Sequence, residues 1–428
     1  MTGPERAPLL VLDVEKVVPG GRMLARHDGR VVLVHGALPG ERVVARPDRS
    51  AKGVIYADTV DVLHASPGRR PGTVDLRCGG AVLAHATYAE QLTLKTAIVA
   101  DALRRLGRLD LPPGFRIMPS PEQGYRLRAR LHVQAGRVGF LREGSHVLCD
   151  ACGTGQLAES TCAWLHHFLA RAGVVLAAVS AIEVAEDIAG RRRACHLTLT
   201  RPEPALDPAA LMDGLAGLSL AIDGQRVPML AGEPDLTDTI APDADAPAVV
   251  RLTRSVRAFF QANRFLVQAL AQHVVAQVPD GPVADLYAGV GLFGLCLAAH
   301  GHDDITVVEG DVLSGEDLER NARAFGGQVH VVRRSVEEYL RHARRGQVRT
   351  VVVDPPRTGL SRQAIDGLLA SSPERLVYVS CDPPTLARDL RLLGEAGYGL
   401  RSCVALDMFP GTAHVECVSV LERDTRPS

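Results

Sequence analysis

The sequence predicts a chain of three parts: a small β-barrel, a mixed α+β segment and a doubly wound, mostly parallel α/β domain. Residues 8–64 contain short β-prone runs separated by turn signals, as small barrels do. From about residue 255 apolar strand-like runs alternate with amphipathic helical runs, a pattern that implies a parallel sheet covered by helices. The length of 428 residues suffices for two or three domains. We expect domains over residues 1–66, 67–248 and 249–428.

The first part carries a hairpin signal. Asp28 and Gly29 lie between the β-prone runs "RMLA" and "VVLVHG", and Asp-Gly is a preferred two-residue hairpin turn. Another turn and strand follow in "ALPGERVVARP". This density of short strands favours a five-stranded barrel of the OB type, and "ASPGRRPG" (residues 65–72) is typical of a linker after it.

The middle part begins with a predicted helix over residues 86–107, with Gly107 as its C-cap, and we expect this helix to pack on the third domain. In the strand that follows, apolar residues occupy one face, and Arg126, Arg128 and Arg130 share the other. That basic face is either an RNA-facing strand or an ordinary solvated sheet face. "APDADAPA" (residues 241–248) is typical of a linker.

The bulk composition limits location and partners. The net charge of −1 gives no overall attraction to a polyanion, so any nucleic-acid surface must be a local patch. The N-terminal residues contain no signal-peptide core, and the chain has no run of about 18 apolar residues. We therefore expect a cytoplasmic protein without membrane association, whose nine cysteines are free or reactive rather than paired.

A cofactor site is predicted at "DLYAGVGLFGL" (residues 285–295), where Gly289 and Gly291 lie at a strand-to-helix turn. Glu309 ends the next strand, where a carboxylate can accept hydrogen bonds from both ribose hydroxyls of a nucleoside. With Gly294, the glycines have the G-x-G-x-x-G spacing of dinucleotide sites, so the spacing alone does not exclude a dinucleotide cofactor. Asp285 and the later "DPP" favour S-adenosylmethionine instead.

The candidate catalytic residues follow strands of the third domain. Asp354 ends "VVVD" before two prolines, with Arg357 where amine methyltransferases place an aromatic residue, which argues against adenine N6 as the target. Cys381 ends "VYVSC", and Glu416 lies on the last strand. A thiolate can add to carbon 6 of a pyrimidine and activate carbon 5 for methylation, and a carboxylate can remove the carbon-5 proton. Taken singly, Cys381 is equally well interpreted as a thiol buried in the core, and Glu416 as a charge at the edge of the sheet that faces solvent.

These motifs resemble those of one family. "FFQANRFL", "DLYAGVGLFGL", "DPPRTGL", "VYVSCDPPTLARDL" and "MFPGTAHVEC" resemble, in order, motifs of the RNA uracil-C5 methyltransferases, whose catalytic domain is Rossmann-like. The N-terminal part resembles the family's TRAM domain. The resemblance implies Cys381 as nucleophile and Glu416 as base. It also implies S-adenosylmethionine contacts at these positions: Gln261, Tyr287, Gly289, Gly291, Leu292, Glu309, Ser335 and Asp354.

Some members of that family bind an iron–sulfur cluster through four cysteines. Here only Cys78 of "CGG" is kept, while Gly72 and Ala81 occupy the positions of two other ligands. Cys149 and Cys152 are present further along the chain, which makes three thiols at most. Because a cubane cluster normally takes four ligands, we expect no cluster and no other metal, with Cys78 as a remnant of the motif.

The expected function is methyl transfer from S-adenosylmethionine to carbon 5 of a uridine in structured RNA, with 23S ribosomal RNA favoured. The alternatives are a tRNA uridine, cytosine-C5 methylation, or a non-catalytic RNA-binding chaperone. Arg126, Arg128 and Arg130 are the candidate RNA contacts. No obligate protein partner is expected.

Overall fold

The N-terminal part of the protein is a closed five-stranded barrel in a computed structural model that describes residues 8–204, 206–222, 225–243 and 248–424. The strand order is β1-β2-β3-β5-β4. The strands are β1 (Leu10–Val17), β2 (Met23–His27), β3 (Arg30–His35), β4 (Arg42–Ala51) and β5 (Val54–His64). Asp28 (φ 47°) and Gly29 (φ 75°) form the predicted hairpin turn between β2 and β3. The predicted barrel is thus confirmed.

A helix connects the barrel to the catalytic domain. Helix α1 (Tyr88–Ala102) begins at Thr87, whose hydroxyl accepts a hydrogen bond from the Glu90 amide, and continues into a π-helical turn, Leu103–Gly107. The left-handed residue that ends this turn is Arg108 (φ 54°), so the prediction of Gly107 as the C-cap is wrong. Gly107 lies against Ala387 of helix α8 (Pro383–Glu395), where an added Cβ would be 3.3 Å from the Ala387 carbonyl oxygen. Its small size serves this close packing.

The middle part is built on a seven-stranded sheet with order β13-β12-β11-β10-β7-β8-β9. Helix α2 (Glu159–Ala172) covers one of its faces through Trp164, Leu165 and Phe168. The strands are β7 (Arg128–Gln134), β8 (Arg137–Leu141), β9 (Leu148–Cys149), β10 (Val179–Glu186), β11 (Arg193–Leu199), β12 (Gly217–Ile222) and β13 (Gln225–Gly232).

Two connections link this part to the catalytic domain. Strands β14 (Asp235–Ile240) and β15 (Val250–Ser255) form an antiparallel ribbon, so the segment predicted as a linker lies between paired strands, and its residues 244–247 lie outside the described residues. Strand β6 (Ile117–Met118), which precedes the middle sheet, pairs in parallel with the last-but-one strand of the catalytic sheet, β21 (Tyr398–Leu406). The catalytic sheet is therefore completed by a strand from outside residues 249–428.

The catalytic domain is an eight-stranded sheet with order β18-β17-β16-β19-β20-β22-β21-β6. Strands β16 to β20 are parallel, and β22 is antiparallel to both of its neighbours, as the doubly wound prediction required. The other strands are β16 (Val283–Leu286), β17 (Ile305–Val308), β18 (Val329–Val332), β19 (Thr350–Val353), β20 (Arg375–Ser380) and β22 (Glu416–Arg423).

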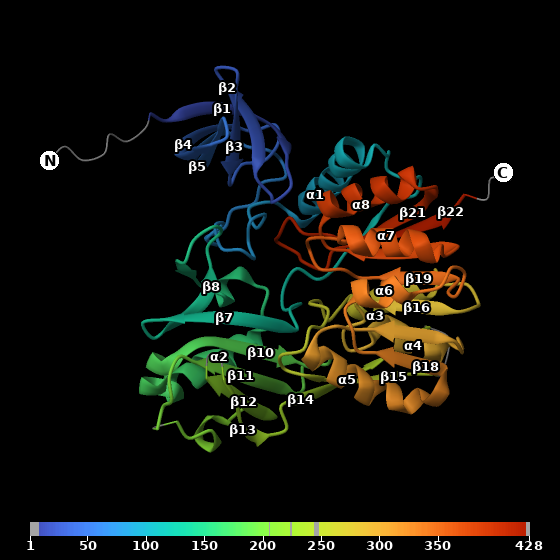
Figure 1. Cartoon of the computed structure of the whole chain (residues 1–428). Helices are drawn as coiled ribbons and strands as arrows, with labels where there is room; N and C mark the ends of the chain where they lie inside the picture. The colour runs from blue at the N-terminus through green and yellow to red at the C-terminus, as the bar shows by residue number, and fades with distance from the viewer. Residues whose placement is uncertain (1–7, 205, 223–224, 244–247, 425–428) are drawn as a thin grey trace.

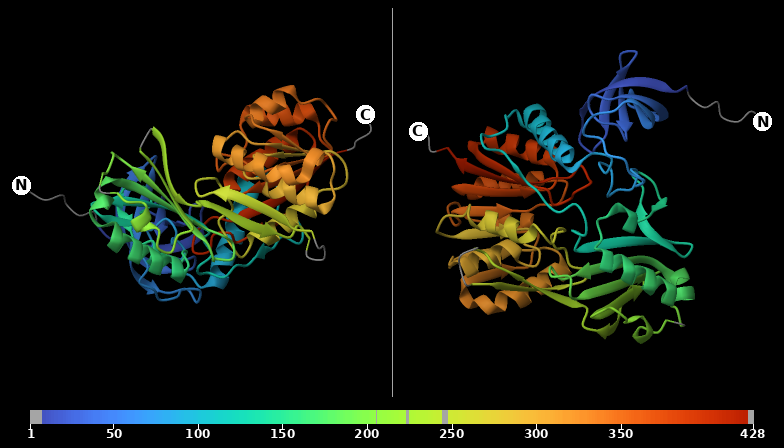
Figure 2. Two further views of the ribbon diagram at one scale, coloured as in Figure 1. Left: turned by 90° about the horizontal axis from the view of Figure 1, so that it is seen from below. Right: turned by 180° about the vertical axis from the view of Figure 1, so that it is seen from behind.

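Helices cover both faces of this sheet. One apolar core includes residues of α3 (Val267–Val275), α4 (Leu292–His300) and α5 (Val312–Ala322). A second core includes residues of α1, α6 (Val336–His342), α7 (Arg362–Ser371) and α8. The barrel and the middle sheet both lie on one side of the catalytic domain, with α1 beside α8 (Figures 1 and 2).

Candidate active site

One edge of the catalytic sheet brings the predicted catalytic residues together. Register pairing places Leu286 beside Val353 and Val353 beside Tyr378, so β16, β19 and β20 end close to one another. Asp354 and Cys381 follow β19 and β20 at this carboxyl edge, where doubly wound folds bind their ligands. Strand β22 runs the opposite way and begins at Glu416, so this residue enters the sheet at the same edge.

The glycine turn after β16 leaves an open backbone. Tyr287 (φ 62°), Gly289 (φ 57°) and Gly291 (φ 100°) all adopt left-handed conformations. An added Cβ at Gly289 would meet nothing within 4 Å, whereas one at Gly291 would lie 2.7 Å from Leu295. Gly289 therefore leaves space for a ligand, and Gly291 allows α4 to begin close to the turn. Tyr287 is a non-glycine residue in a costly conformation, which is common at binding sites.

A pocket opens at this turn. It is lined by Phe259, Phe260, Gln261, Tyr287, Ala288, Gly289, Val290, Leu292, Phe293 and Asp354. Five of the predicted cofactor residues are in this lining. The Gln261 amide nitrogen donates to Asp354 Oδ2 at 2.9 Å, which fixes both side chains beside the pocket.

The remaining predicted cofactor residues lie just outside this lining. The Glu309 carboxylate accepts hydrogen bonds from the Gly289 amide at 2.8 Å and the Asp311 amide at 2.6 Å, so it supports the glycine turn from the neighbouring strand. Ser335 lies next to Gly310, whose added Cβ would be 3.3 Å from the Ser335 Cα. The Ser335 hydroxyl accepts from the Glu338 amide at 3.2 Å and so caps α6.

The site has an acidic character that suits a cationic ligand. Burial raises the pKa of Asp285 to about 8 and that of Asp354 to about 7. Burial likewise raises the pKa of Glu309 and Glu416. One oxygen of Asp285, Oδ1, is buried without a partner among the described residues. Buried carboxyl groups are stabilised by a positively charged group nearby. S-adenosylmethionine carries a positively charged sulfonium, so the residues at this site fit that cofactor.

Cys381 and Glu416 are cross-strand neighbours. Ser380 pairs with Cys417 in the antiparallel ladder of β20 and β22, which sets the next residues, Cys381 and Glu416, beside each other. Glu416 is buried, and Cys381 is the one free cysteine in the described residues that is not. Burial, followed by the nearby Glu416, raises the pKa of Cys381 to about 12.

Two further residues belong to this site. The Arg357 guanidinium lies near the Cys381 thiol, and its positive charge opposes the rise in the pKa of the thiol. From the sequence, Arg357 indicated only that adenine is not the target. The His414 ring lies near the Cys381 backbone, and burial lowers the pKa of the ring to about 4, so the ring is neutral. Arg357 lies in "DPPRTGL" and His414 in "MFPGTAHVEC", so their places in these motifs could have identified them as site residues from the sequence.

The three arginines predicted to contact RNA form ion pairs and hydrogen bonds with other side chains of the protein. Arg128 and Arg130 both pair with Glu183 of the adjacent strand β10, and the Arg126 guanidinium donates to the Gln156 side chain at 2.7 Å. The predicted alternation of buried and outward residues is present, but the outward face is not uniformly basic. The Arg130 side chain remains 58% exposed.

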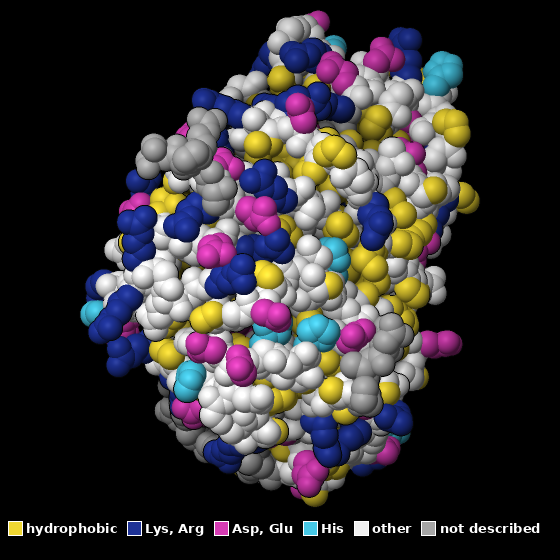
Figure 3. Space-filling view, turned by 90° about the vertical axis from the view of Figure 1, so that its right-hand side faces the viewer, with side chains coloured by type: hydrophobic (Ala, Val, Ile, Leu, Met, Phe, Trp, Pro, Cys, Tyr) yellow, Lys and Arg dark blue, Asp and Glu magenta, His cyan; other side chains and the backbone are white. Residues whose placement is uncertain are grey.

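The catalytic-domain side of the protein has a mixed surface. On the face drawn in Figure 3, Lys and Arg side chains are interspersed with Asp and Glu. A mixed surface of this kind provides little attraction for a polyanion. In the described part of the chain, no helix is long and apolar enough to cross a membrane.

The expectation of unpaired cysteines is wrong for four of the nine. Cys78 forms a disulfide with Cys149, and Cys152 forms one with Cys162. The first pair is 71 residues apart and is brought together by a bridge between Cys78 and Arg142, at the end of the β8–β9 hairpin. The described residues contain no group of three or more His, Cys, Asp or Glu that could hold a metal ion.

Comparison with known proteins identifies the class and then the family. A profile of the tRNA (uracil-5-)-methyltransferases matches residues 250–424, and a TRAM domain profile matches residues 8–60. The structure of Pyrococcus abyssi tRNA (uracil-54, C5)-methyltransferase in complex with S-adenosyl-L-homocysteine has a TM-score of 0.74 at 23% identity. That alignment covers 96% of this chain and 100% of the archaeal one. Fold and site define an S-adenosylmethionine-dependent methyltransferase with an N-terminal TRAM domain.

Relatives in curated collections define the family. The 23S rRNA (uracil(1939)-C(5))-methyltransferase RlmD of Pseudomonas putida is 33% identical over 96% of this chain and 93% of its own length. An RNA methyltransferase of Lactobacillus johnsonii is 32% identical over 94% of this chain and 95% of its own. This chain belongs to the RNA uracil-C5 methyltransferase family, and it is an enzyme that uses S-adenosylmethionine and acts on RNA.

Proposed function

We propose that this enzyme methylates carbon 5 of a uridine in 23S ribosomal RNA through a covalent bond between Cys381 and carbon 6 of the base. The observation that carries the proposal is the juxtaposition of Cys381 and Glu416 on adjacent strands, beside Asp354 and the open glycine turn. A nucleophile and a base on neighbouring strands can reach carbons 6 and 5 of one pyrimidine ring.

The proposed chemistry proceeds in three steps. The Cys381 sulfur bonds to carbon 6, and the electron pair of the C5=C6 bond moves into an enolate at carbon 5 and the C4 carbonyl. Carbon 5 then takes the methyl group as the methyl–sulfur bond breaks, leaving S-adenosylhomocysteine. Finally, Glu416 takes the carbon-5 proton, the C5=C6 bond reforms, and the C6–S bond breaks to release the Cys381 thiolate.

The neighbouring residues support these steps. Arg357 places a positive charge beside the thiol and lowers the cost of forming the thiolate, since an opposite charge favours the ionised form. Gln261 and Asp354 hold each other in place by a hydrogen bond. Both line the pocket, as do Tyr287, Gly289 and Leu292. S-adenosylmethionine supplies an electrophilic methyl group and a positive charge when it binds there. Glu309, Gly291 and Ser335 shape the turn and its rim in this proposal.

The choice of RNA follows from the relative of known specificity. RlmD of Pseudomonas putida, which acts on 23S rRNA, matches this chain over nearly its whole length. The archaeal tRNA enzyme has the same fold at 23% identity, and this similarity concerns fold alone. In the proposal, the barrel of residues 1–66 and the middle part of residues 67–248 bind the RNA around the target uridine, in the cytoplasm where ribosomes are assembled.

The test uses recombinant enzyme with transcripts of 23S rRNA and, separately, of tRNA. Nucleosides are analysed by mass spectrometry after incubation with S-adenosylmethionine. We expect 5-methyluridine in the 23S transcript. Methylation of the tRNA alone would refute the ribosomal assignment, and 5-methylcytidine would refute the uracil assignment. RNA binding without any methylated nucleoside would support a non-catalytic RNA chaperone.

A further inference from the structure

The loop of residues 407–415 carries the chain from the end of β21 to the base Glu416. It contains no helix or strand, and its internal hydrogen bonds are few. The Thr412 amide and hydroxyl donate to the Phe409 carbonyl at 3.2 Å and 2.8 Å, and the Thr412 hydroxyl accepts from the His414 amide at 3.1 Å. The loop also contains His414, which contacts the backbone of Cys381. Residues outside the loop must therefore fix its position.

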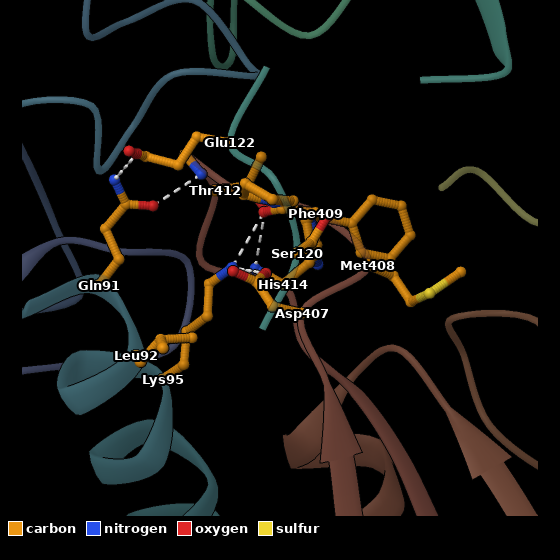
Figure 4. A network of polar contacts seen from close by, with 12 residues as sticks. Gln91, Leu92, Lys95, Ser120, Glu122, Asp407, Met408, Phe409, Thr412 and His414 are labelled. Carbon is orange, nitrogen blue, oxygen red and sulfur yellow. Dashed lines mark hydrogen bonds and ion pairs between the residues drawn. The ribbon is translucent and has the colours of Figure 1, made fainter. Parts of the chain in front are cut away.

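Lys95 of helix α1 supports the start of the loop. Its ammonium forms an ion pair with Asp407 at the start of the loop and donates to the Phe409 carbonyl at 2.9 Å (Figure 4). Both side chains of the ion pair are 0% exposed. A buried ion pair stabilises a fold little more than apolar side chains of similar volume, but it allows only a narrow range of geometries. The pair is therefore better suited to fixing a position than to adding stability.

Gln91, one helical turn before Lys95, holds the middle of the loop. Its side-chain oxygen accepts from the Gly411 amide at 2.8 Å, and its nitrogen donates to Glu122 at 3.1 Å (Figure 4). The Gly411 carbonyl accepts from the Leu83 amide at 2.8 Å, so Gly411 is bonded on both sides. Tyr125 adds a hydrogen bond from its hydroxyl to the Pro410 carbonyl at 3.1 Å.

Asn263 connects the start of the loop to the cofactor pocket. Its side-chain nitrogen donates to Ser120 at 2.8 Å and to the Met408 carbonyl at 3.3 Å. Asn263 lies two residues after Gln261, which bonds Asp354 at the pocket. The same loop is thus tied to the cofactor side of the site and to α1, and α1 comes from a different part of the chain.

We infer that Lys95, with Asp407, is a positioning residue that holds the 407–415 loop so that Glu416 and His414 face Cys381. This inference rests on the proposed function and deepens it. It assigns a catalytic support to a helix outside residues 249–428. It also separates two requirements: formation of the bond between Cys381 and RNA needs the thiol, whereas release of that bond needs Glu416 in place.

The test compares Lys95→Met with Lys16→Met. Lys16 forms a part-exposed ion pair with Asp101 of the same helix and has no hydrogen bond or ion pair to the loop among the described residues, so it is the matched control. We expect Lys95→Met to lower kcat by about tenfold or more with an unchanged KM for RNA, because small displacements of catalytic groups have effects of this size. Covalent enzyme–RNA adduct should accumulate on denaturing gels. Lys16→Met should match the wild type in both measurements.

Two further variants address misfolding. Lys95→Met leaves Asp407 as an unpaired buried charge, so the double variant Lys95→Met/Asp407→Asn removes both charges. Gln91→Leu removes one hydrogen bond to the loop without exposing a buried charge, and it gives the same measurement if both charge variants misfold. Wild-type kcat in whichever of these variants folds would overturn the inference, as would a lower kcat without adduct.

The outcome for Glu416→Gln separates the inference from the proposed function. If Glu416→Gln accumulates the adduct and the Lys95 and Gln91 variants do not, the positioning role is refuted and the mechanism stands. If Glu416→Gln yields no adduct, the assignment of the base is refuted first, and the positioning role with it.

Discussion

The carboxyl edge of the catalytic sheet and the cysteine-containing region of residues 78–162 have opposite effects on stability. At the sheet edge, Asp285, Asp354 and Glu416 are buried with raised pKa values, a state that costs stability. Between residues 78 and 162, four cysteines are joined in two disulfides, and such cross-links add stability. Groups that must react are kept strained and available, whereas groups that only connect segments are made unreactive.

The largest expected effect tests the reactive region. Cys381→Ala should abolish methylation, because no other free thiol in the described residues is accessible. Binding of S-adenosylmethionine, measured by calorimetry, should stay within about twofold of the wild type, since Cys381 is not among the residues that line the pocket. Residual turnover of 5-methyluridine in this variant would exclude covalent catalysis by Cys381.

The second prediction concerns pH. Burial raises the pKa of the Cys381 thiol to about 12, and the thiol must lose this one proton before its sulfur can bond to carbon 6. The Cys381 thiol is therefore protonated at neutral pH, so activity is lost as pH falls and gained as it rises. We expect kcat/KM to increase by about tenfold per pH unit between about pH 6.5 and about pH 9. Arg357→Gln should shift this rise to higher pH, and a flat profile in the wild type would contradict the prediction.

The third prediction tests the unreactive region. Under denaturing conditions without reductant we expect five free thiols, and after reduction all nine. The Cys78–Cys149 bridge closes a loop of 71 residues, so replacing both with Ser should lower the free energy of unfolding by about 2–4 kcal/mol. The value of kcat at a temperature well below unfolding should not change. A large loss of kcat would show that this region also supports the active site.

The smallest effect is expected at the RNA surface. Arg130→Ala should raise the KM for RNA by about two- to fivefold and reduce the salt dependence of binding by about one charge, because one exposed guanidinium is removed. Arg362, which is exposed on α7 and paired with Asp366, provides a control that should leave binding unchanged. Equal binding by both variants would remove Arg130 from the RNA interface.

Local rules account for what the sequence predicted well. The barrel hairpin, the glycine turn and the strand ends that carry Asp354 and Cys381 all follow from a few neighbouring residues, since turn preferences and strand ends are local properties. Glu416 was reached by the resemblance and by its place on the last strand. These features required no knowledge of how distant segments pack.

Distant contacts account for what the sequence did not predict. Cys78 and Cys149 are joined across 71 residues, and Lys95 reaches Asp407 across 312. Glu183, which neutralises part of the basic strand, comes from a strand 53 residues after Arg130. The helical turn after α1 ends at Arg108 rather than at Gly107, and Gly107 instead packs closely against Ala387 of α8, a contact between segments far apart in the sequence.

Strand β6 has a consequence for how the protein is made. Ile117 and Met118 leave the ribosome early, but their partner strand β21 lies close to the end of the chain. Until β21 is synthesised, this short strand has no partner strand with which to form hydrogen bonds. Helix α1 likewise lacks the apolar surface of α8 against which it packs. Premature termination anywhere before β21 would therefore leave β6 without a partner strand as well as the catalytic sheet incomplete, and such fragments should be targets for proteolysis.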